Sequence, residues 1–87
     1  MQTTIVKVFY PHGLHLRMAA RLVQKSKDFK SRIMFCKDCK FADGYSILQL
    51  LLLEATKDSQ LRIVAVGEDE DKVIQELAGL FNDGAGI

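Results

Sequence analysis

The sequence predicts a small α+β domain in which amphipathic helices cover one face of a single sheet. Two observations predict this class. Apolar residues alternate in some segments and recur every three to four residues in others, so strands and helices are mixed along the chain. The length of 87 residues is that of one domain, which we assign to residues 1–87. The resulting order of elements is β-α-β-β-α-β-α.

The first half of the chain contains three of the predicted strands. β-branched residues alternate between Thr4 and Tyr10, with the better apolar face on the even positions, which predicts a strand. The period then changes, and residues 16–27 are predicted to form a helix. Two short strands follow at residues 31–36 and 40–42. We expect a tight turn at Lys37-Asp38 between them, although this turn lacks the glycine usual in two-residue hairpins.

The second half begins with a helix from Ile47 to about Glu54 that is apolar on almost every side. Ser46, with Gln49 three residues later, fits a capping box at its start. A domain this small cannot bury all faces of that helix, so one face is expected to serve a partner. Residues 54–59 contain no glycine, so the helix must end with a less favoured residue at positive φ, or unwind differently.

The remaining elements are a strand at residues 61–66 and a final helix. The acidic run 68–71 lies at the start of this helix, where it favours the helix dipole and does not have the spacing of a calcium-binding loop. The helix is predicted to be closed by Asn82, Asp83 and Gly84.

Composition excludes several classes of function. Hydrophobic residues make up 48% and charged residues 26%, which argues against disorder, and the net charge of +1 gives no bulk field for nucleic acid. The longest apolar stretch, residues 47–53, is too short to span a membrane. The amino terminus lacks the pattern of a secretory signal, so we expect a cytoplasmic protein.

The most informative stretch is residues 13–20, Gly-Leu-His-Leu-Arg-Met-Ala-Ala. His15 falls at or just before the first helical turn, where backbone N–H groups have no partner within the helix. An anion beside His15 would meet these donors, and Arg17 adds a guanidinium suited to phosphate oxygens. The combination suits a phosphoryl group on the imidazole, whose neutral form can attack phosphorus. A polar loop histidine near a helix cap is the alternative, and the residues alone leave both open.

Over its full length the chain resembles the HPr family, the histidine-containing phosphocarriers of the bacterial phosphoenolpyruvate-dependent phosphotransferase system. Three stretches match in register: residues 13–20 with His15 and Arg17, Ser46-Ile47-Leu48, and residues 66–70. The resemblance implies an open-faced β-sandwich, with a four-stranded antiparallel sheet and three helices on one face.

The resemblance implies a phosphocarrier that is not itself an enzyme and needs no cofactor. His15 would accept the phosphoryl group from an enzyme I-type kinase, Arg17 would bind the phosphate, and a histidine of an enzyme IIA-type domain would receive it. Ser46 matches a site that a serine kinase and phosphorylase act on in some members, although a serine that caps a helix needs no regulatory role. The alternative is a regulatory binding module that docks to a kinase or transcription regulator, with His15 phosphorylation as a signal or unused.

Three features depart from the family pattern. Met18 stands where the family usually has proline, which is expected to leave the loop around His15 less fixed. His12 stands where the family often has asparagine; it is either a second phosphate contact when protonated or a plain loop histidine. Residues 50–53 and 80–84 resemble the nitrogen-related branch more than the sugar-uptake branch, which leaves the pathway open.

Phosphoryl carriage requires brief docking to a donor and then to an acceptor. If the helices starting near residues 16 and 47 pack side by side, an apolar patch beside His15 is formed by Leu16, Ala20, Ile47, Leu48 and Leu51. Three basic side chains four residues apart, Arg17, Arg21 and Lys25, would steer this patch toward acidic partners. An ordinary solvated helix face has the same pattern. We expect the protein to be a monomer.

Cys36-Lys37-Asp38-Cys39 is a CxxC motif. No second ligand pair accompanies it, and a hairpin offers no helix start to stabilise a thiolate, so we expect neither a metal site nor a redox function.

Overall fold

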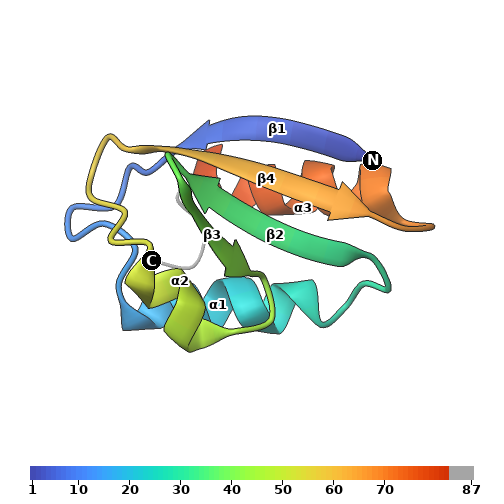
Figure 1. Cartoon of the computed structure of the whole chain (residues 1–87), viewed down its shortest axis with the longest axis horizontal. Helices are drawn as coiled ribbons and strands as arrows, with labels where there is room; N and C mark the ends of the chain where they lie inside the picture. Colours follow the sequence, from blue (N-terminus) through green and yellow to red (C-terminus); the bar gives the residue numbers. More distant parts are fainter. Residues whose placement is uncertain (83–87) are drawn as a thin grey trace.

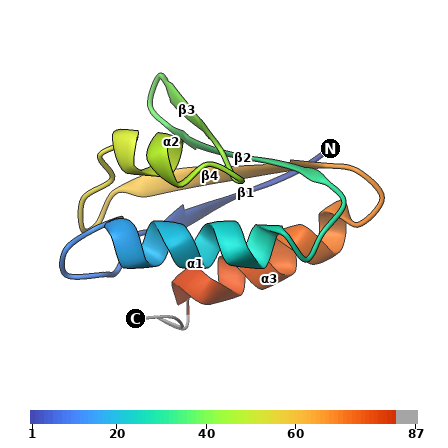
Figure 2. The same ribbon diagram turned by 90° about the horizontal axis from the view of Figure 1, so that it is seen from below.

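Four antiparallel strands form one sheet, and three helices pack on one side of it (Figures 1 and 2). The computed structural model describes residues 1–82. The elements are β1 (Gln2–Lys7), α1 (Leu16–Ser26), β2 (Arg32–Lys37), β3 (Lys40–Asp43), α2 (Ile47–Leu52), β4 (Gln60–Val66) and α3 (Glu70–Asn82). The strand order in the sheet is β1-β4-β2-β3. The predicted open-faced sandwich and its element order are confirmed.

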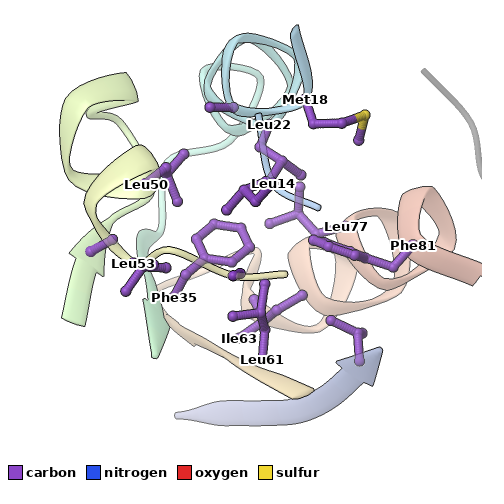
Figure 3. Close-up of a cluster of buried hydrophobic side chains, with 14 of the residues drawn as sticks. Leu14, Met18, Leu22, Phe35, Leu50, Leu53, Leu61, Ile63, Leu77 and Phe81 are labelled. Atoms are coloured by element: carbon purple, nitrogen blue, oxygen red, sulfur yellow. The ribbon is translucent and has the colours of Figure 1, made fainter. Parts of the chain in front are cut away.

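The hydrophobic core lies between the inner face of the sheet and the helices. Alternate strand residues point inward because successive side chains of a strand face opposite sides. Helix residues at three- and four-residue spacing meet them (Figure 3). The fully buried side chains include Ile33, Phe35, Leu61, Ile63, Leu22, Leu50, Leu77 and Phe81. The other face of the sheet is open, and Ile5 and Val66 lie exposed there.

The first strand ends earlier than its alternation predicts. Val6, Val8 and Tyr10 are all buried, so the expected apolar face is correct. The ladder with β4, however, stops at the pair Lys7–Gln60, and Asp58 beyond it has a φ of +72°. Val8 still bonds to the segment before β4, since its amide donates to the Ser59 carbonyl at 2.9 Å and its carbonyl accepts from the Asp58 amide at 2.7 Å. The regular strand nevertheless ends at Lys7, and Tyr10 lies beyond both contacts. Tyr10 is instead held by its hydroxyl, which donates to the Leu80 carbonyl at 3.0 Å, and burial raises its pKa to about 12.

Two further boundaries depend on single residues at positive φ. The hairpin turn lies at Asp38-Cys39, one residue later than predicted, because Lys37 pairs with Lys40. Asp38 supplies the left-handed conformation, with φ +54°, that glycine usually provides. Helix α2 ends at Leu52, before the predicted Glu54, whose φ is +56°. The expected non-glycine stop is therefore present. Of the predicted closing residues of α3, Asp83 and Gly84 lie outside the described residues.

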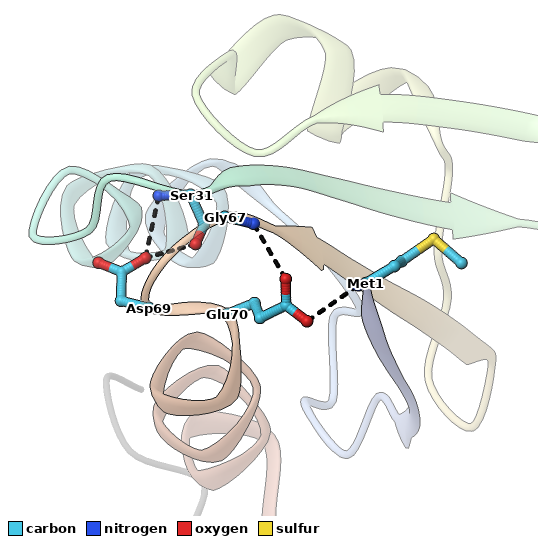
Figure 4. Close-up of polar contacts among 5 residues, drawn as sticks. All are labelled: Met1, Ser31, Gly67, Asp69 and Glu70. Carbon is cyan, nitrogen blue, oxygen red and sulfur yellow. Dashed lines mark hydrogen bonds and ion pairs between the residues drawn. The ribbon is translucent and has the colours of Figure 1, made fainter.

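Carboxylates hold the start of α3, as the acidic run there predicts (Figure 4). Asp69 accepts hydrogen bonds from the backbone of Lys30 and from both the backbone and the hydroxyl of Ser31. Glu70 accepts from the Gly67 amide at 3.1 Å and pairs with the Met1 ammonium at 2.9 Å. Donation by the Ser31 hydroxyl and the Lys30 amide lowers the pKa of Asp69, and the Met1 ammonium and Gly67 amide lower the pKa of Glu70.

Candidate functional site

The loop before α1 is held against the segment that follows α2. Gly13 has a φ of +69°, and a Cβ there would lie 2.4 Å from the Ala55 carbonyl oxygen, so only glycine fits. The Gly13 amide donates to the Tyr10 carbonyl, and the Leu14 amide donates to the Ala55 carbonyl at 2.8 Å. These contacts place the next residue, His15, at the tip of α1.

His15 is the N-cap of α1 and is half-buried. Its Nδ1 accepts a hydrogen bond from the Arg17 amide at 3.2 Å, so the lone pair of Nδ1 faces the free amides of the first turn. When the ring is neutral its proton is then on Nε2. The ring is not sealed inside the core, and the nitrogen that points at the helix start is the one that carries a lone pair when the ring is neutral.

The surroundings of His15 favour an anion. Helix α1 has no acidic residue in its first turn, and Arg17 is exposed beside the cap. Within residues 1–82 the Arg17 guanidinium makes no hydrogen bond and no ion pair. His12 lies close by: its ring centroid is 6.2 Å from that of His15, in an edge-on arrangement. Positive charge and free N–H donors thus converge on one half-buried imidazole.

Met18, which departs from the family pattern, is fully buried. Its side chain leaves α1 on the side of α3 (Figure 3), so methionine here is a core residue. The first intrahelical bond runs from the Ala19 amide to the His15 carbonyl, at 2.9 Å.

The predicted docking residues lie on two neighbouring helices, α1 and α2, which contact each other (Figures 1 and 2). Leu16 and Leu48, in the first turns of these helices, are 63% and 66% exposed. Ala20, Ile47 and Leu51 are half-buried, and the last two pack against the core. Arg21 is exposed.

One exposed apolar residue of α2 was not predicted. Leu52 is 60% exposed, whereas Leu50 and Leu53 are buried. Leu52 stands four residues after Leu48, so the helical period could have placed both on the outer face. It shares a shallow pocket with Phe41 of β3, which is itself 64% exposed. The apolar surface therefore extends past α2 to the edge of the sheet.

Ser46 caps α2 as predicted, and its hydroxyl accepts from the Gln49 amide at 3.2 Å. The other half of the capping box differs. The Gln49 side chain accepts from the Asp43 amide at 2.9 Å and so ties α2 to the end of β3. Ser46 is half-buried and directly precedes α2, whose first turn includes the exposed Leu48.

Both cysteines are free thiols near the tip of the β2–β3 hairpin. Burial raises the pKa of the Cys36 thiol, an effect that Arg62 partly opposes. Among residues 1–82 no three His, Cys, Asp or Glu side chains are grouped so that they could hold a metal ion. No helix in the same range is long and apolar enough to cross a membrane.

A family model described as the PTS HPr component phosphorylation site matches residues 2–83. The chain belongs to the HPr family. The match includes the loop with His15 and both neighbouring helices. The family consists of phosphocarrier proteins of the phosphotransferase system, which is the coarse function of this chain.

Individual relatives agree with this assignment. The phosphocarrier protein HPr of Buchnera aphidicola subsp. Acyrthosiphon pisum is 37% identical over 78 residues, covering 90% of this chain and 92% of that protein. The crystal structure of HPr-C-His from Thermoanaerobacter tengcongensis superposes with a TM-score of 0.94 at 30% identity, covering 100% of this chain and 98% of that one. The Bacillus subtilis catabolite repression protein Crh, solved as a swapped dimer, has a TM-score of 0.77 at 31% identity, with 95% of each chain covered.

Proposed function

We propose that this chain accepts a phosphoryl group on Nδ1 of His15 from an enzyme I-type, phosphoenolpyruvate-dependent kinase and passes it to a histidine of an enzyme IIA-type domain. One observation carries the proposal. Nδ1 of His15 faces the Arg17 amide at the start of α1, which has no acidic residue in its first turn. An incoming phosphoryl group would replace the imidazole lone pair as the acceptor for that amide.

The chemistry needs little from the chain beyond position and charge. The Nδ1 lone pair forms the new N–P bond while the bond from phosphorus to the donor's nitrogen breaks, and the electron pair returns to the donor. The proton on Nε2 can then leave to solvent. The Arg17 guanidinium, unpaired within residues 1–82, would hold the phosphoryl oxygens during transfer. The same groups serve the second transfer, in which the acceptor histidine attacks phosphorus and the N–P bond to His15 breaks.

The exposed apolar surface is the proposed docking site for both partners. Leu16 and Leu48 would pack against the donor and then the acceptor, with Leu52 extending the contact and Arg21 supplying charge at its rim. A docking surface of only a few exposed side chains gives weak, fast-exchanging complexes, because the entropy lost on association offsets most of the free energy gained by burying apolar area. We propose that the chain acts as a cytoplasmic monomer of one domain.

The decisive experiment is incubation with enzyme I and phosphoenolpyruvate, followed by intact mass and mapping of the modified residue. We expect one acid-labile phosphoryl group on His15 and none on His15→Ala. The control His12→Asn keeps the phosphoacceptor and is expected to be labelled. Adding IIA-type domains of the sugar-uptake and nitrogen-related branches separately would show which one removes the label. A wild-type chain that stays unlabelled while a known HPr is labelled in the same mixture contradicts the proposal.

A second candidate function is a regulatory binding module, favoured by the similarity to the Bacillus subtilis catabolite repression protein Crh. In that case Ser46 would be the switch. A phosphate on Ser46 would place about two negative charges at the start of α2, next to Leu48. Ser46→Ala should cost about 1 kcal/mol by loss of the cap, whereas Ser46→Asp keeps a capping oxygen. If Ser46→Asp, but not Ser46→Ala, slows transfer from enzyme I, added charge acts on docking and not on the fold.

A further inference from the structure

The sheet face that the helices leave uncovered, called here the open sheet face, carries apolar side chains where a solvated face normally carries polar ones. In Figure 1 the strands lie in front of α3, so this face is turned toward the viewer. The strand registers place its side chains in rows across the sheet. The first row is Ile5, Arg62, Cys36 and Phe41, the second is Thr3, Val64, Met34 and Asp43, and the third pairs Val66 with Arg32.

The apolar members of these rows form a continuous patch. Val64 is directly opposite Met34 and lies on the same side of β4 as Val66, and both Val64 and Met34 are half-buried. Ile5 and Val66 are 56% and 46% exposed, and Phe41 continues the patch to the edge strand β3. Every strand thus contributes an apolar side chain to a surface that the described chain does not cover. A contiguous patch of this kind marks an interaction surface.

Two guanidiniums stand among these apolar side chains. Arg62 lies in the first row and Arg32 in the third, and neither makes an ion pair within residues 1–82. Among the residues of the three rows the one carboxylate is Asp43, at the β3 edge, where it accepts from the Tyr45 amide at 2.9 Å. Asp38 of the hairpin turn lines a shallow pocket with Arg62, beyond ion-pair distance. The patch therefore lacks carboxylates that match its cations, and a partner would have to bring them.

A second copy of this chain fits the open sheet face poorly. Three of the strands are six or seven residues long, so the face measures about 20 Å by 20 Å, or about 400 Å². Two copies packed face to face would bury about 800 Å², less than the roughly 1,200 Å² of the smallest stable interfaces. Each copy would also bring two cations and one carboxylate to the contact, so the charges would not balance.

An amphipathic helix with acidic flanks meets both requirements. On the inner face of the same sheet, α3, with 13 residues, contacts β1 and β4. A helix of about 13 residues is about 20 Å long, which is the length of about six strand residues. Its apolar stripe would cover Val64 and Met34, and carboxylates beside the stripe would pair with Arg32 and Arg62.

We propose that the open sheet face is a docking surface for an amphipathic helix of another protein, with an apolar stripe flanked by carboxylates. Helix α1, whose tip carries His15, lies on the other side of the sheet (Figure 2). A partner on the open sheet face therefore leaves the imidazole accessible. Such a partner can hold the chain in place while other proteins contact the His15 side, and its docking does not depend on phosphorylation.

The first test uses two synthetic helical peptides that share one leucine stripe and differ only in the flanking residues, which are glutamate in one and lysine in the other. Each peptide is titrated into isotope-labelled protein, and the amide NMR signals are followed. We expect the acidic peptide to shift the signals of residues 3–5, 32–36 and 62–66, with a dissociation constant of about 10–100 μM. The basic peptide should bind about tenfold more weakly or less.

Two double variants separate the charges from the apolar contact. Arg32→Glu combined with Arg62→Glu should reverse the preference, so that the basic peptide binds more tightly than the acidic one. Ile5→Thr combined with Val64→Thr keeps β-branched side chains in the strands and should weaken the acidic peptide by about tenfold, with transfer from enzyme I unchanged. Leu16→Ser, an exposed leucine on α1, is the matched control and should bind the acidic peptide as the wild type does.

Three results in the titration would overturn the proposal: shifts centred on Leu16 and Leu48, equal binding of the two peptides, or no binding. Shifts of the open sheet face that grow with protein concentration, without peptide, would make a second copy the occupant and overturn the acidic helix. Binding to vesicles of phosphatidylglycerol and phosphatidylcholine that is lost in the Ile5→Thr, Val64→Thr variant would do the same in favour of a lipid surface. Labelling of His15 by enzyme I in the same samples tests the proposed function separately.

Discussion

Helices α1 and α3 both begin with backbone N–H groups that have no partner within the helix, but only α3 begins with carboxylates of its own. Asp69 and Glu70 stand at the start of α3 (Figure 4). Asp69 accepts hydrogen bonds from the amides of Lys30 and Ser31, and Glu70 accepts one from the amide of Gly67. The start of α1, at the opposite end of the molecule in Figure 1, has an imidazole and an arginine instead.

The difference separates a structural helix start from one that is open to a ligand. At α3 the anions are side chains of the protein itself: Asp69 ties the α1–β2 loop, and Glu70 ties the amino terminus, to the start of α3. At α1 the corresponding place has no carboxylate in the first turn, as the proposed phosphoryl group on His15 requires. A helix start of this kind stabilises bound phosphate without any conformational change, because its donors are already oriented.

Gly13→Ala should have the largest effect, because it disturbs the packing on Ala55 that holds the loop before the start of α1. A Cβ at this position would meet the Ala55 carbonyl oxygen at 2.4 Å, and the φ of +69° disfavours any other residue. We expect a loss of about 2–3 kcal/mol in the free energy of unfolding, measured by urea denaturation. Labelling of His15 should fall as well, because the loop shifts. An unchanged midpoint in urea would show that the loop is not held as described.

Arg17→Glu converts the open helix start into one that resembles α3. A carboxylate in the first turn satisfies the dipole and repels an incoming phosphoryl group. We expect the rate of transfer from enzyme I to fall by about tenfold or more, with stability unchanged or slightly higher by thermal melting. Arg17→Gln, which removes the cation without adding an anion, should lie between Arg17→Glu and the wild type. If both variants transfer normally, Arg17 does not contact the phosphoryl group.

Asp69→Asn tests the start of α3, where the carboxylate of the chain itself accepts the hydrogen bonds. The pKa of Asp69 is lowered in the folded state, so its stabilising contribution is present above its usual range and is lost as the pH falls below about 4. The wild type should therefore lose Tm steeply in acid. The variant should start with a lower Tm at pH 7 and depend less on pH between 5 and 2.5. Transfer from enzyme I at pH 7 should be unaffected, and a large drop in transfer would show that the two ends are coupled.

Regular periodicity allowed most of the fold to be predicted. The strand around Ile63 and the buried stripe of α3 alternate or repeat without interruption, so local pattern and burial agree. Boundaries were predicted less well where they depend on a distant segment. The alternation of the first strand continues to Tyr10, but the strand ends at Lys7 because its partner turns away at Asp58. No local signal in residues 4–10 contains that information.

In the candidate site, too, features set by the local sequence could be predicted and features set by distant segments could not. That His15 would stand at a helix start follows from the neighbouring glycine and the change of period, both of which are local. The approach of His12 to His15 depends on how the turn at Pro11 packs against Ala55, and a sequence pattern does not give that distance. Leu52 could have been found from the four-residue spacing after Leu48.

Arg21→Glu should produce the smallest effect, because it changes the approach of partners and not the open helix start itself. Arg21 is exposed on α1, one turn beyond Arg17, and makes no ion pair within residues 1–82. Reversing its charge should slow transfer from enzyme I by a few-fold at low salt, and the difference should vanish at high salt, because steering is screened within about 10 Å at 0.1 M. Stability should stay within about 0.5 kcal/mol of the wild type. Equal rates at low salt would remove steering, whereas a deficit that persists in high salt would place Arg21 inside the docked interface.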